Sequence, residues 1–161
     1  QVAEQAAAEA AAPPEVPKLS SMLDFSVDGM MEGVTLTGWF NAEPDGRWSN
    51  ADSAEIRLPR PPEAGQTLSL ELFGRVFGTQ VSGPAMVEVR IDGVVATSLR
   101  FENDDFTRQK VEIDCSRLSR GGTEVPVSLR RAGAVSPAEA GEGSDERRLG
   151  VLVHTLGVVW Q

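Results

Sequence analysis

The sequence predicts an all-β fold, an antiparallel jelly-roll β-sandwich of about nine strands. Hydrophobic residues make up 40% of the 161 residues, enough to form a buried core in a single domain. Most of them lie in short runs that alternate with polar residues, and a period of two is typical of a strand with one buried face. The 16 Gly and 10 Pro separate these runs, which favours many short strands over long helices.

The N-terminal segment differs in composition from the rest of the chain. Residues 1–19 are rich in Ala and contain Pro13, Pro14 and Pro17. Ala with scattered Glu favours a short helix, but the prolines would end it and favour an extended linker. We therefore expect a flexible tether over residues 1–19 and the sandwich domain over residues 20–161. A processing remnant is the alternative interpretation of the first residues.

Nine segments of the domain have the pattern of a strand. They cover residues 22–27, 33–39, 53–58, 67–73, 86–91, 94–101, 109–114, 125–131 and 149–160. The clearest two are joined by Asp92-Gly93, which is typical of a type I′ hairpin because both central residues of that turn need a positive φ. In the long polar connection before the last strand, Ser136 and Pro137 are suited to begin one helical turn.

The segment 38–49 combines large aromatic and charged side chains. It contains Trp39, Glu43, Arg47 and Trp48, and a proline and a glycine within it exclude a helix. Indole rings can stack on a sugar ring, while Glu accepts and Arg donates hydrogen bonds to its hydroxyls. The alternative is structural, with both indoles in the core and a Glu43–Arg47 ion pair closing the turn.

A second group of charges lies just before the last strand. Asp145 and Arg147 belong to a run of alternating charges there, and we expect them at the same end of the sandwich as Glu43 and Arg47. They either contribute to the same ligand site or form a structural salt bridge. Such a bridge adds little stability when it is exposed.

Acidic residues gather in two further places, and oxygen-rich loops of this kind can hold calcium. The two groups are Asp24, Asp28 and Glu32, and Glu102, Asp104 and Asp105. Neither group has the spacing of an EF-hand. A solvated acidic loop is therefore the preferred interpretation. No cofactor is expected, and a structural calcium ion is the alternative.

Little in the sequence supports catalysis. The single His154 lies in an apolar run and is expected to be a satisfied strand residue. The single Cys115 cannot form an intramolecular disulfide and is expected in the core. The sequence contains no nucleophile elbow, phosphate-binding loop or dinucleotide fingerprint. We predict that the domain is not an enzyme.

The charge and hydropathy of the chain bear on its partners. The formal net charge is −9, and an acidic surface repels the phosphate backbone, so nucleic acid is not an expected partner. No apolar run reaches the roughly 18 residues of a membrane-spanning helix. The chain is therefore not expected to span a membrane itself.

Three parts of the sequence together resemble a β-sandwich domain of bacterial cell-envelope proteins. They are a Gly-Trp, Glu and Gly-x-Trp-Ser pattern in residues 38–49, a Val-x-Val-x-Ile-Asp-Gly hairpin in residues 87–93, and Ser-Pro followed by Asp-x-Arg-x-Leu-Gly in residues 136–150. That domain is appended to membrane glycosyltransferases and phosphoglycerol-transferase-like proteins. The resemblance implies a carbohydrate-module-like jelly roll in envelope polysaccharide metabolism. It also implies a periplasmic or extracellular location, with a tether to the membrane through a larger protein.

The sequence thus predicts a non-catalytic glycan-recognition or accessory domain of bacterial envelope polysaccharide machinery. The residues predicted to contact the glycan are Trp39, Glu43, Arg47, Trp48, Asp145 and Arg147. The alternative is a structural or assembly module that binds other protein chains through the sandwich and the N-terminal segment. A glycan site predicts exposed indoles in a concavity, whereas an assembly module predicts buried indoles and an exposed apolar sheet face.

Overall fold

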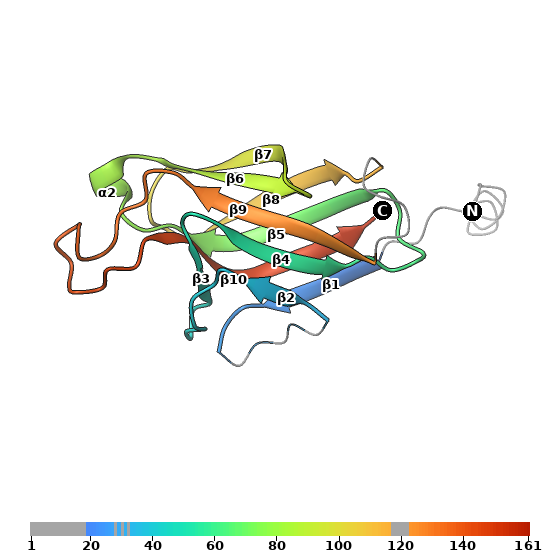
Figure 1. The fold of residues 1–161 in the computed structure, drawn as a ribbon, viewed down its shortest axis with the longest axis horizontal. Helices are drawn as coiled ribbons and strands as arrows, with labels where there is room; N and C mark the ends of the chain where they lie inside the picture. Colours follow the sequence, from blue (N-terminus) through green and yellow to red (C-terminus); the bar gives the residue numbers. More distant parts are fainter. Residues whose placement is uncertain (1–18, 28, 30, 32, 117–122) are drawn as a thin grey trace, which may run out of the picture.

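The described part of the chain folds into two antiparallel sheets of five strands each, packed face to face (Figure 1). A computed structural model describes residues 19–27, 29, 31, 33–116 and 123–161. The prediction of an all-β sandwich is confirmed. The predicted tether lies outside the described residues except for its last position, Leu19, which begins the first strand.

Sheet A contains the first and last strands of the domain. Its strand order is β1-β10-β5-β8, and β3 pairs with the first half of β10. The bounds are β1 (Leu19–Asp24), β3 (Arg47–Asn50), β5 (Thr67–Arg75), β8 (Thr107–Asp114) and β10 (Leu149–Trp160). β1 runs antiparallel to β10, with Leu19 opposite Trp160.

Sheet B contains the remaining strands in the order β2-β4-β9-β6-β7. Its bounds are β2 (Thr35–Thr37), β4 (Ala54–Pro59), β6 (Ala85–Ile91), β7 (Val94–Phe101) and β9 (Glu124–Arg131). The turn between β6 and β7 has φ 51° at Asp92 and 80° at Gly93. These positive angles confirm the predicted hairpin.

The core lies between the two sheets and follows from the alternation in the sequence. In β5, Leu68, Leu70 and Leu72 point inward and are at most 5% exposed, whereas Glu71 is exposed on the other face. Each leucine buried in this way contributes about 1.5–3 kcal/mol relative to an exposed one. Cys115 is fully buried, as predicted, and burial raises the pKa of its thiol.

Two elements differ from the strands that the sequence predicts. β3 is an additional short strand within the predicted turn segment, and a four-residue helix, α2 (Thr79–Ser82), follows β5. The predicted helical turn near Ser136 is present, because the Ala140 amide donates to the Ser136 carbonyl at 3.0 Å. The Glu139 amide also donates to the Ser136 hydroxyl at 3.1 Å, which caps the turn. Among the residues that the structure describes, we find no helix with the length and hydropathy of a transmembrane segment.

Candidate functional site

The two segments predicted to form the site meet at one end of sheet A, which we call the loop end (residues 38–49 and 132–148). A tight turn precedes β3, where the Glu43 amide donates to the Gly46 carbonyl at 2.7 Å. Gly46 has φ +136°, and a Cβ added to it would clash with the Val153 carbonyl oxygen. The turn therefore lies directly against β10 and requires glycine at this position.

Trp39 supports the loop end from inside. Its side chain is partly buried and packs against the main core, with its ring 5.2 Å from the ring of Phe25. The indole N–H donates to the Glu55 carbonyl at 3.1 Å. This bond satisfies the polar atom of the indole within the protein.

Trp48 is 5% exposed and belongs to a small second core on the solvent side of sheet A. Its buried partners there are Leu149 and Leu152, and Phe40 and Phe77 pack against them. The ring of Trp48 is therefore buried, as the structural alternative predicts, and offers little surface for stacking on a sugar.

Arg47 and Glu43 do not form the ion pair that the structural alternative predicts. Both residues are described, and none of the ion pairs within 4.0 Å joins them. Glu43 is exposed, whereas Nε of Arg47 is buried without a hydrogen-bond partner. The alternative is wrong on this point because the turn is closed by backbone hydrogen bonds between Glu43 and Gly46.

Asp145 and Arg147 pair with each other two residues apart. Nη2 of Arg147 donates to Oδ2 of Asp145 at 2.7 Å, and Nε donates to Oδ1 at 3.0 Å. These bonds lower the pKa of the Asp145 carboxyl and raise the pKa of Arg147, to which the nearby charge of Glu43 also contributes. The Arg147 guanidinium lies 5.0 Å from the centre of the Phe40 ring. Arg147 is thus the residue that links Asp145, Phe40 and the charge of Glu43 at the loop end.

Three of the acidic side chains considered for calcium, Asp24, Glu102 and Asp104, are engaged within the protein. Asp28 and Glu32 lie outside the described residues, and Asp24 accepts a hydrogen bond from the Ser26 amide at 2.9 Å. Glu102 pairs with Arg100. Within the described ranges, no three His, Cys, Asp or Glu side chains form a group able to hold a metal ion.

Asp104 is a structural carboxylate at the start of α2. It accepts hydrogen bonds from the Gly78 amide at 2.9 Å, the Thr79 amide at 3.0 Å and the Thr79 hydroxyl at 2.7 Å. Burial raises the pKa of Asp104, but these bonds and the charge of Arg131 outweigh it, so the pKa is lowered overall. Arg131 is 3% exposed, and its Nη1 donates to the Leu149 carbonyl at 3.2 Å.

An aromatic cluster that the sequence analysis missed lies on the outer face of sheet A, the face turned away from sheet B. The rings of Phe73 and Phe106 stack with centroids 5.2 Å apart, and the His154 ring meets Phe73 edge-on at 5.9 Å. The guanidinium of Arg108 lies 4.6 Å from the Phe73 ring centre, and that of Arg75 lies 5.6 Å from the Phe106 ring centre. Phe106 remains 38% exposed.

His154 reaches this cluster because β10 carries a bulge. Val153 pairs with Gly74 and Thr155 pairs with Phe73, so His154 is the extra residue between them. Its Nδ1 lies 2.9 Å from the Asp45 carbonyl oxygen. The prediction of a satisfied strand histidine is confirmed, and this contact links the aromatic cluster to the turn of the loop end.

An open groove of about 590 Å³ continues from the aromatic cluster along the outer face. Hydroxyl, carboxylate, ammonium and amide groups lie along it together with small and apolar side chains. Its lining residues are Ser20, Ser21, Met22, Ser69, Glu71, Lys110, Gly157, Val159 and Gln161. Glu71 joins the groove to the cluster, because its Oε1 lies 3.5 Å from Nη1 of Arg108.

Gly157 leaves the groove without a side chain at its centre, between β1 and β5. It pairs with Met22 on one side and with Glu71 on the other. A Cβ added here would lie 3.6 Å from Cε of Met22 and 3.7 Å from Cβ of Glu71, both ordinary contacts. The packing of the strands therefore does not require glycine at this position.

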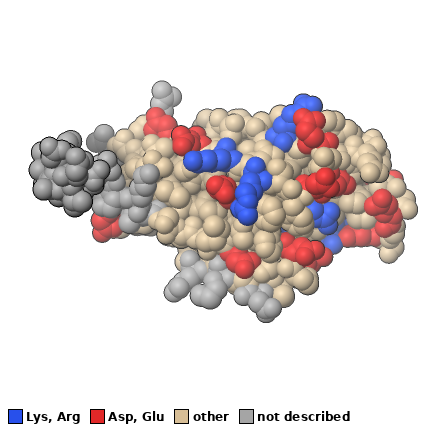
Figure 2. Space-filling view, turned by 180° about the vertical axis from the view of Figure 1, so that it is seen from behind, with Lys and Arg blue, Asp and Glu red and all other residues tan. Residues whose placement is uncertain are grey.

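Charges of both signs are interspersed on the side of the molecule seen from behind. Figure 2 shows Lys and Arg side chains lying among Asp and Glu side chains there. Although the chain carries a net charge of −9, this side offers both hydrogen-bond donors and acceptors. A ligand rich in hydroxyl groups can use both.

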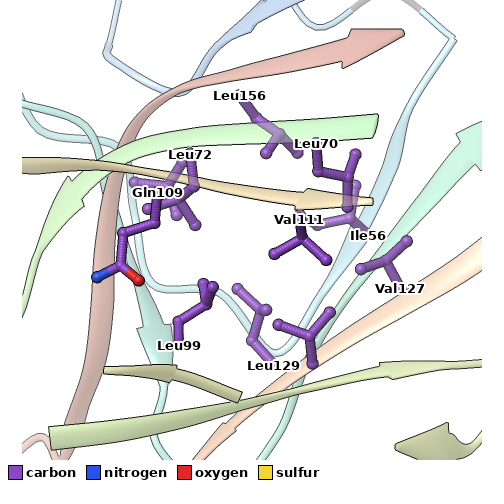
Figure 3. A pocket seen from close by; sticks show the side chains of 11 residues that line it. Ile56, Leu70, Leu72, Leu99, Gln109, Val111, Val127, Leu129 and Leu156 are labelled. Atoms are coloured by element: carbon purple, nitrogen blue, oxygen red, sulfur yellow. The ribbon is translucent and has the colours of Figure 1, made fainter. Parts of the chain in front are cut away.

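The enclosed cavity between the sheets is not a ligand site. It has a volume of about 20 Å³ and, apart from Gln109, only apolar side chains line it (Figure 3). The amide of Gln109 turns away from these side chains and donates to the Arg100 carbonyl at 2.7 Å. A space of this size and polarity is a packing defect of the core.

Solved structures share the fold at low sequence identity. The CBM36-1 domain of a multidomain xylanase from the hindgut metagenome of Trinervitermes trinervoides matches with a TM-score of 0.51 and 12% identity, over 87% of this chain and 96% of that chain. The xylan-binding module CBM15 matches with a TM-score of 0.53 and 9% identity, over 89% and 97% of the two chains. Dimeric latent PorU from Porphyromonas gingivalis matches with a TM-score of 0.57 and 8% identity, over 89% of this chain but 12% of that chain.

These similarities show a shared fold, and they confirm the carbohydrate-module-like sandwich that the family resemblance implies. No curated protein matches the sequence. A family defined by sequence does match, over residues 11–160. The chain therefore belongs to the family described as Domain of unknown function (DUF7024).

Proposed function

We propose that this domain is a non-catalytic glycan-recognition module that binds its ligand along the groove of the outer face of sheet A. The observation that carries the proposal is the continuity of the polar groove with the aromatic cluster through Glu71 and Arg108. Sugar rings present apolar faces and hydroxyl edges. The exposed ring of Phe106 suits the apolar faces, and the polar side chains of the groove suit the hydroxyls.

The loop end extends this surface in the same proposal. Glu43, Asp145 and Arg147 would supply polar contacts to the end of a longer glycan, while Trp39 and Trp48 hold these loops in place from beneath. The contact between Nδ1 of His154 and the carbonyl oxygen of Asp45 joins the aromatic cluster to the loop end and supports this extension. Arg47 would contribute through the part of its side chain that is not buried.

The wider role in the proposal rests on the resemblance of the sequence motifs and on the shared fold. The domain would serve bacterial envelope polysaccharide machinery as an accessory module, outside the cytoplasm and attached to the membrane through a larger protein. Two of the structural neighbours support a glycan as the partner, since one is described as a xylan-binding module and the other as a CBM36-1 domain of a xylanase.

The proposal is tested by filling the groove. Gly157→Leu places a side chain at its centre without a backbone clash, because the site tolerates a Cβ. We expect calorimetric titration with envelope polysaccharide fragments to show binding by the wild type and a weakening of about tenfold or more in this variant, a loss of roughly 1.4 kcal/mol.

Ser128→Leu is the matched control, because it adds the same side chain to β9 in the other sheet. Ser20→Trp, at the exposed edge of the groove, provides a second variant if Gly157→Leu fails to fold. Binding that both groove variants leave unchanged would overturn the proposal, as would a wild type that binds none of the fragments.

A second candidate function is assembly with other protein chains, and the edge of sheet B favours it. β7 is the last strand of this sheet in the described chain, and Val94 and Val95 at its start are 70% and 50% exposed. An apolar edge strand can pair with another chain. Concentration-dependent association in sedimentation equilibrium that Val95→Lys abolishes would support this function, and a monomer at all concentrations would oppose it.

A further inference from the structure

Arg75 occupies an unusual position at the end of β5, between the loop end and the aromatic cluster. Its Cζ lies 5.4 Å from the ring centre of Trp48 and 5.6 Å from that of Phe106. These rings belong to segments far apart in the sequence. The contacts with two rings restrict the guanidinium before a ligand binds. Less side-chain conformational entropy is therefore lost on binding.

The guanidinium of Arg75 makes no hydrogen bond within the described structure, although its backbone lies opposite Leu152 in the sheet. The guanidinium contacts the rings of Trp48 and Phe106, and no carboxylate of the described residues lies within 4.0 Å of it. Two other arginines near the site are paired: Arg108 lies 3.5 Å from Glu71, and Arg147 is bonded to Asp145. Within the aromatic cluster, Arg75 is thus the arginine that no described carboxylate within 4.0 Å neutralises.

The unpaired charge of Arg75 favours an anion at this point. Arg108, which contacts the Phe73 ring, is already paired with Glu71, while the molecule as a whole carries a net charge of −9. An anionic ligand is repelled by most of the surface and attracted where cations are uncompensated. A planar guanidinium presents paired N–H donors that match the two oxygens of a carboxylate or phosphate.

We infer that the glycan bound on this face carries an anionic group, a carboxylate or a phosphate, and that Arg75 is the residue that recognises it. The inference rests on the proposed function and adds the chemical class of the ligand. It places the acidic sugar beside Phe106, at the junction of the groove and the loop end. Neutral sugars of the same chain would lie along the groove toward Gly157.

The test compares three oligosaccharides of equal length, one neutral, one bearing a uronic acid and one bearing a phosphate. We expect the wild type to bind one of the acidic ligands more tightly than the neutral one. Arg75→Gln should weaken that binding by about tenfold or more, because hydrogen bonds to charged groups are stronger than neutral ones, while binding of the neutral ligand stays unchanged. The acidic ligand that loses affinity identifies the group as carboxylate or phosphate.

Two controls separate a role in recognition from a role in structure. Arg100→Gln removes a positive charge from the exposed end of β7 and should leave all affinities unchanged. Arg75→Lys keeps the charge but loses the planar donors, so it should restore only part of the acidic preference.

The outcomes also separate this inference from the proposed function. If Gly157→Leu abolishes binding but the wild type prefers no acidic ligand, or Arg75→Gln weakens neutral and acidic ligands equally, the glycan site stands and the inference about its charge is wrong. If no oligosaccharide binds the wild type, both fail.

Discussion

At the loop end, Trp48 and Leu152 are covered by Phe40 and Phe77, whereas further along the same face of sheet A Phe106 is 38% exposed and Gly157 carries no side chain. Both regions combine aromatic rings with arginines. In the first the rings form a small core of their own, and in the second they border an open groove. Aromatic and charged residues in a loop therefore indicate a ligand site only when the structure leaves their surfaces free.

The largest difference between the regions should appear when an aromatic side chain is removed. Trp48→Ala empties the second core and should lower the free energy of unfolding by about 3–5 kcal/mol. Phe106→Ala is the matched control on the open face and should cost far less, because its ring is already partly solvated. Urea denaturation of both variants measures the difference, and similar losses for the two would contradict the comparison.

An acidic residue that is bonded within the fold and one on the open face should differ next. Asp104→Asn weakens the acceptor of three hydrogen bonds and removes the charge near buried Arg131, so it should destabilise the fold by about 2–3 kcal/mol. Glu71→Gln on the open face should change stability by less than about 1 kcal/mol. Guanidinium denaturation at pH 7 provides the measurement, and equal effects would argue against a structural role for Asp104.

The contribution of Asp104 should also depend on pH. Because its pKa is lowered in the folded state, its ionised form stabilises the fold above the unfolded pKa of about 3.9. This stability is lost as the pH falls through the lower folded pKa. The stability difference between wild type and Asp104→Asn should therefore be constant above about pH 5 and shrink in stronger acid. A difference that persists unchanged to pH 2 would contradict this account.

Two glycines offer a third comparison. Gly46→Ala forces a side chain against the Val153 carbonyl at a positive φ and should cost about 1–3 kcal/mol. Gly157→Ala, where the added Cβ finds ordinary contacts, should change the free energy of unfolding by less than about 1 kcal/mol. Thermal unfolding in a calorimeter distinguishes them. A larger loss for Gly157→Ala would mean that the groove depends on this glycine for its structure.

The smallest effect is expected from the charges of the loop end. Arg147→Gln breaks a pair in which both side chains are about one-third exposed, so it should cost at most about 1 kcal/mol of stability. Glycan affinity should fall by only about two- to fivefold. A loss of affinity of more than fivefold, measured by the same calorimetric titration, would indicate that the glycan binds mainly at the loop end and not in the groove.

Most strands could be predicted because the patterns that indicate them involve only residues close together in the sequence. The alternation in residues 67–73 and the Asp92-Gly93 turn each depend on neighbouring residues, and both are present in the structure. β3 could not be predicted in this way. It has four residues, and Trp48 and Ser49 are buried in succession because the second core covers the outer side of the strand. No alternation remains to mark it.

The groove could not be predicted because it results from strand register. Gly157 lies between Met22 and Glu71 only after three distant strands have paired. Arg75, Trp48 and Phe106 likewise meet through tertiary structure. The loop-end residues are close together as expected from their position in the sequence, but the exposure of their rings depends on Phe40 and Phe77, which carry no such signal.

The pairing of Leu19 with Trp160 has a consequence for how the domain can be joined to other chains. Neighbours in antiparallel strands lie about 5 Å apart, so polypeptide attached before Leu19 and polypeptide attached after Gln161 would leave from one pole of the sandwich. The domain can therefore be inserted into a loop of another protein without separating the two ends of that loop. The same proximity suits circular permutation. A variant in which a short peptide joins Gln161 to Leu19, with new termini between Asp92 and Gly93, should keep the fold.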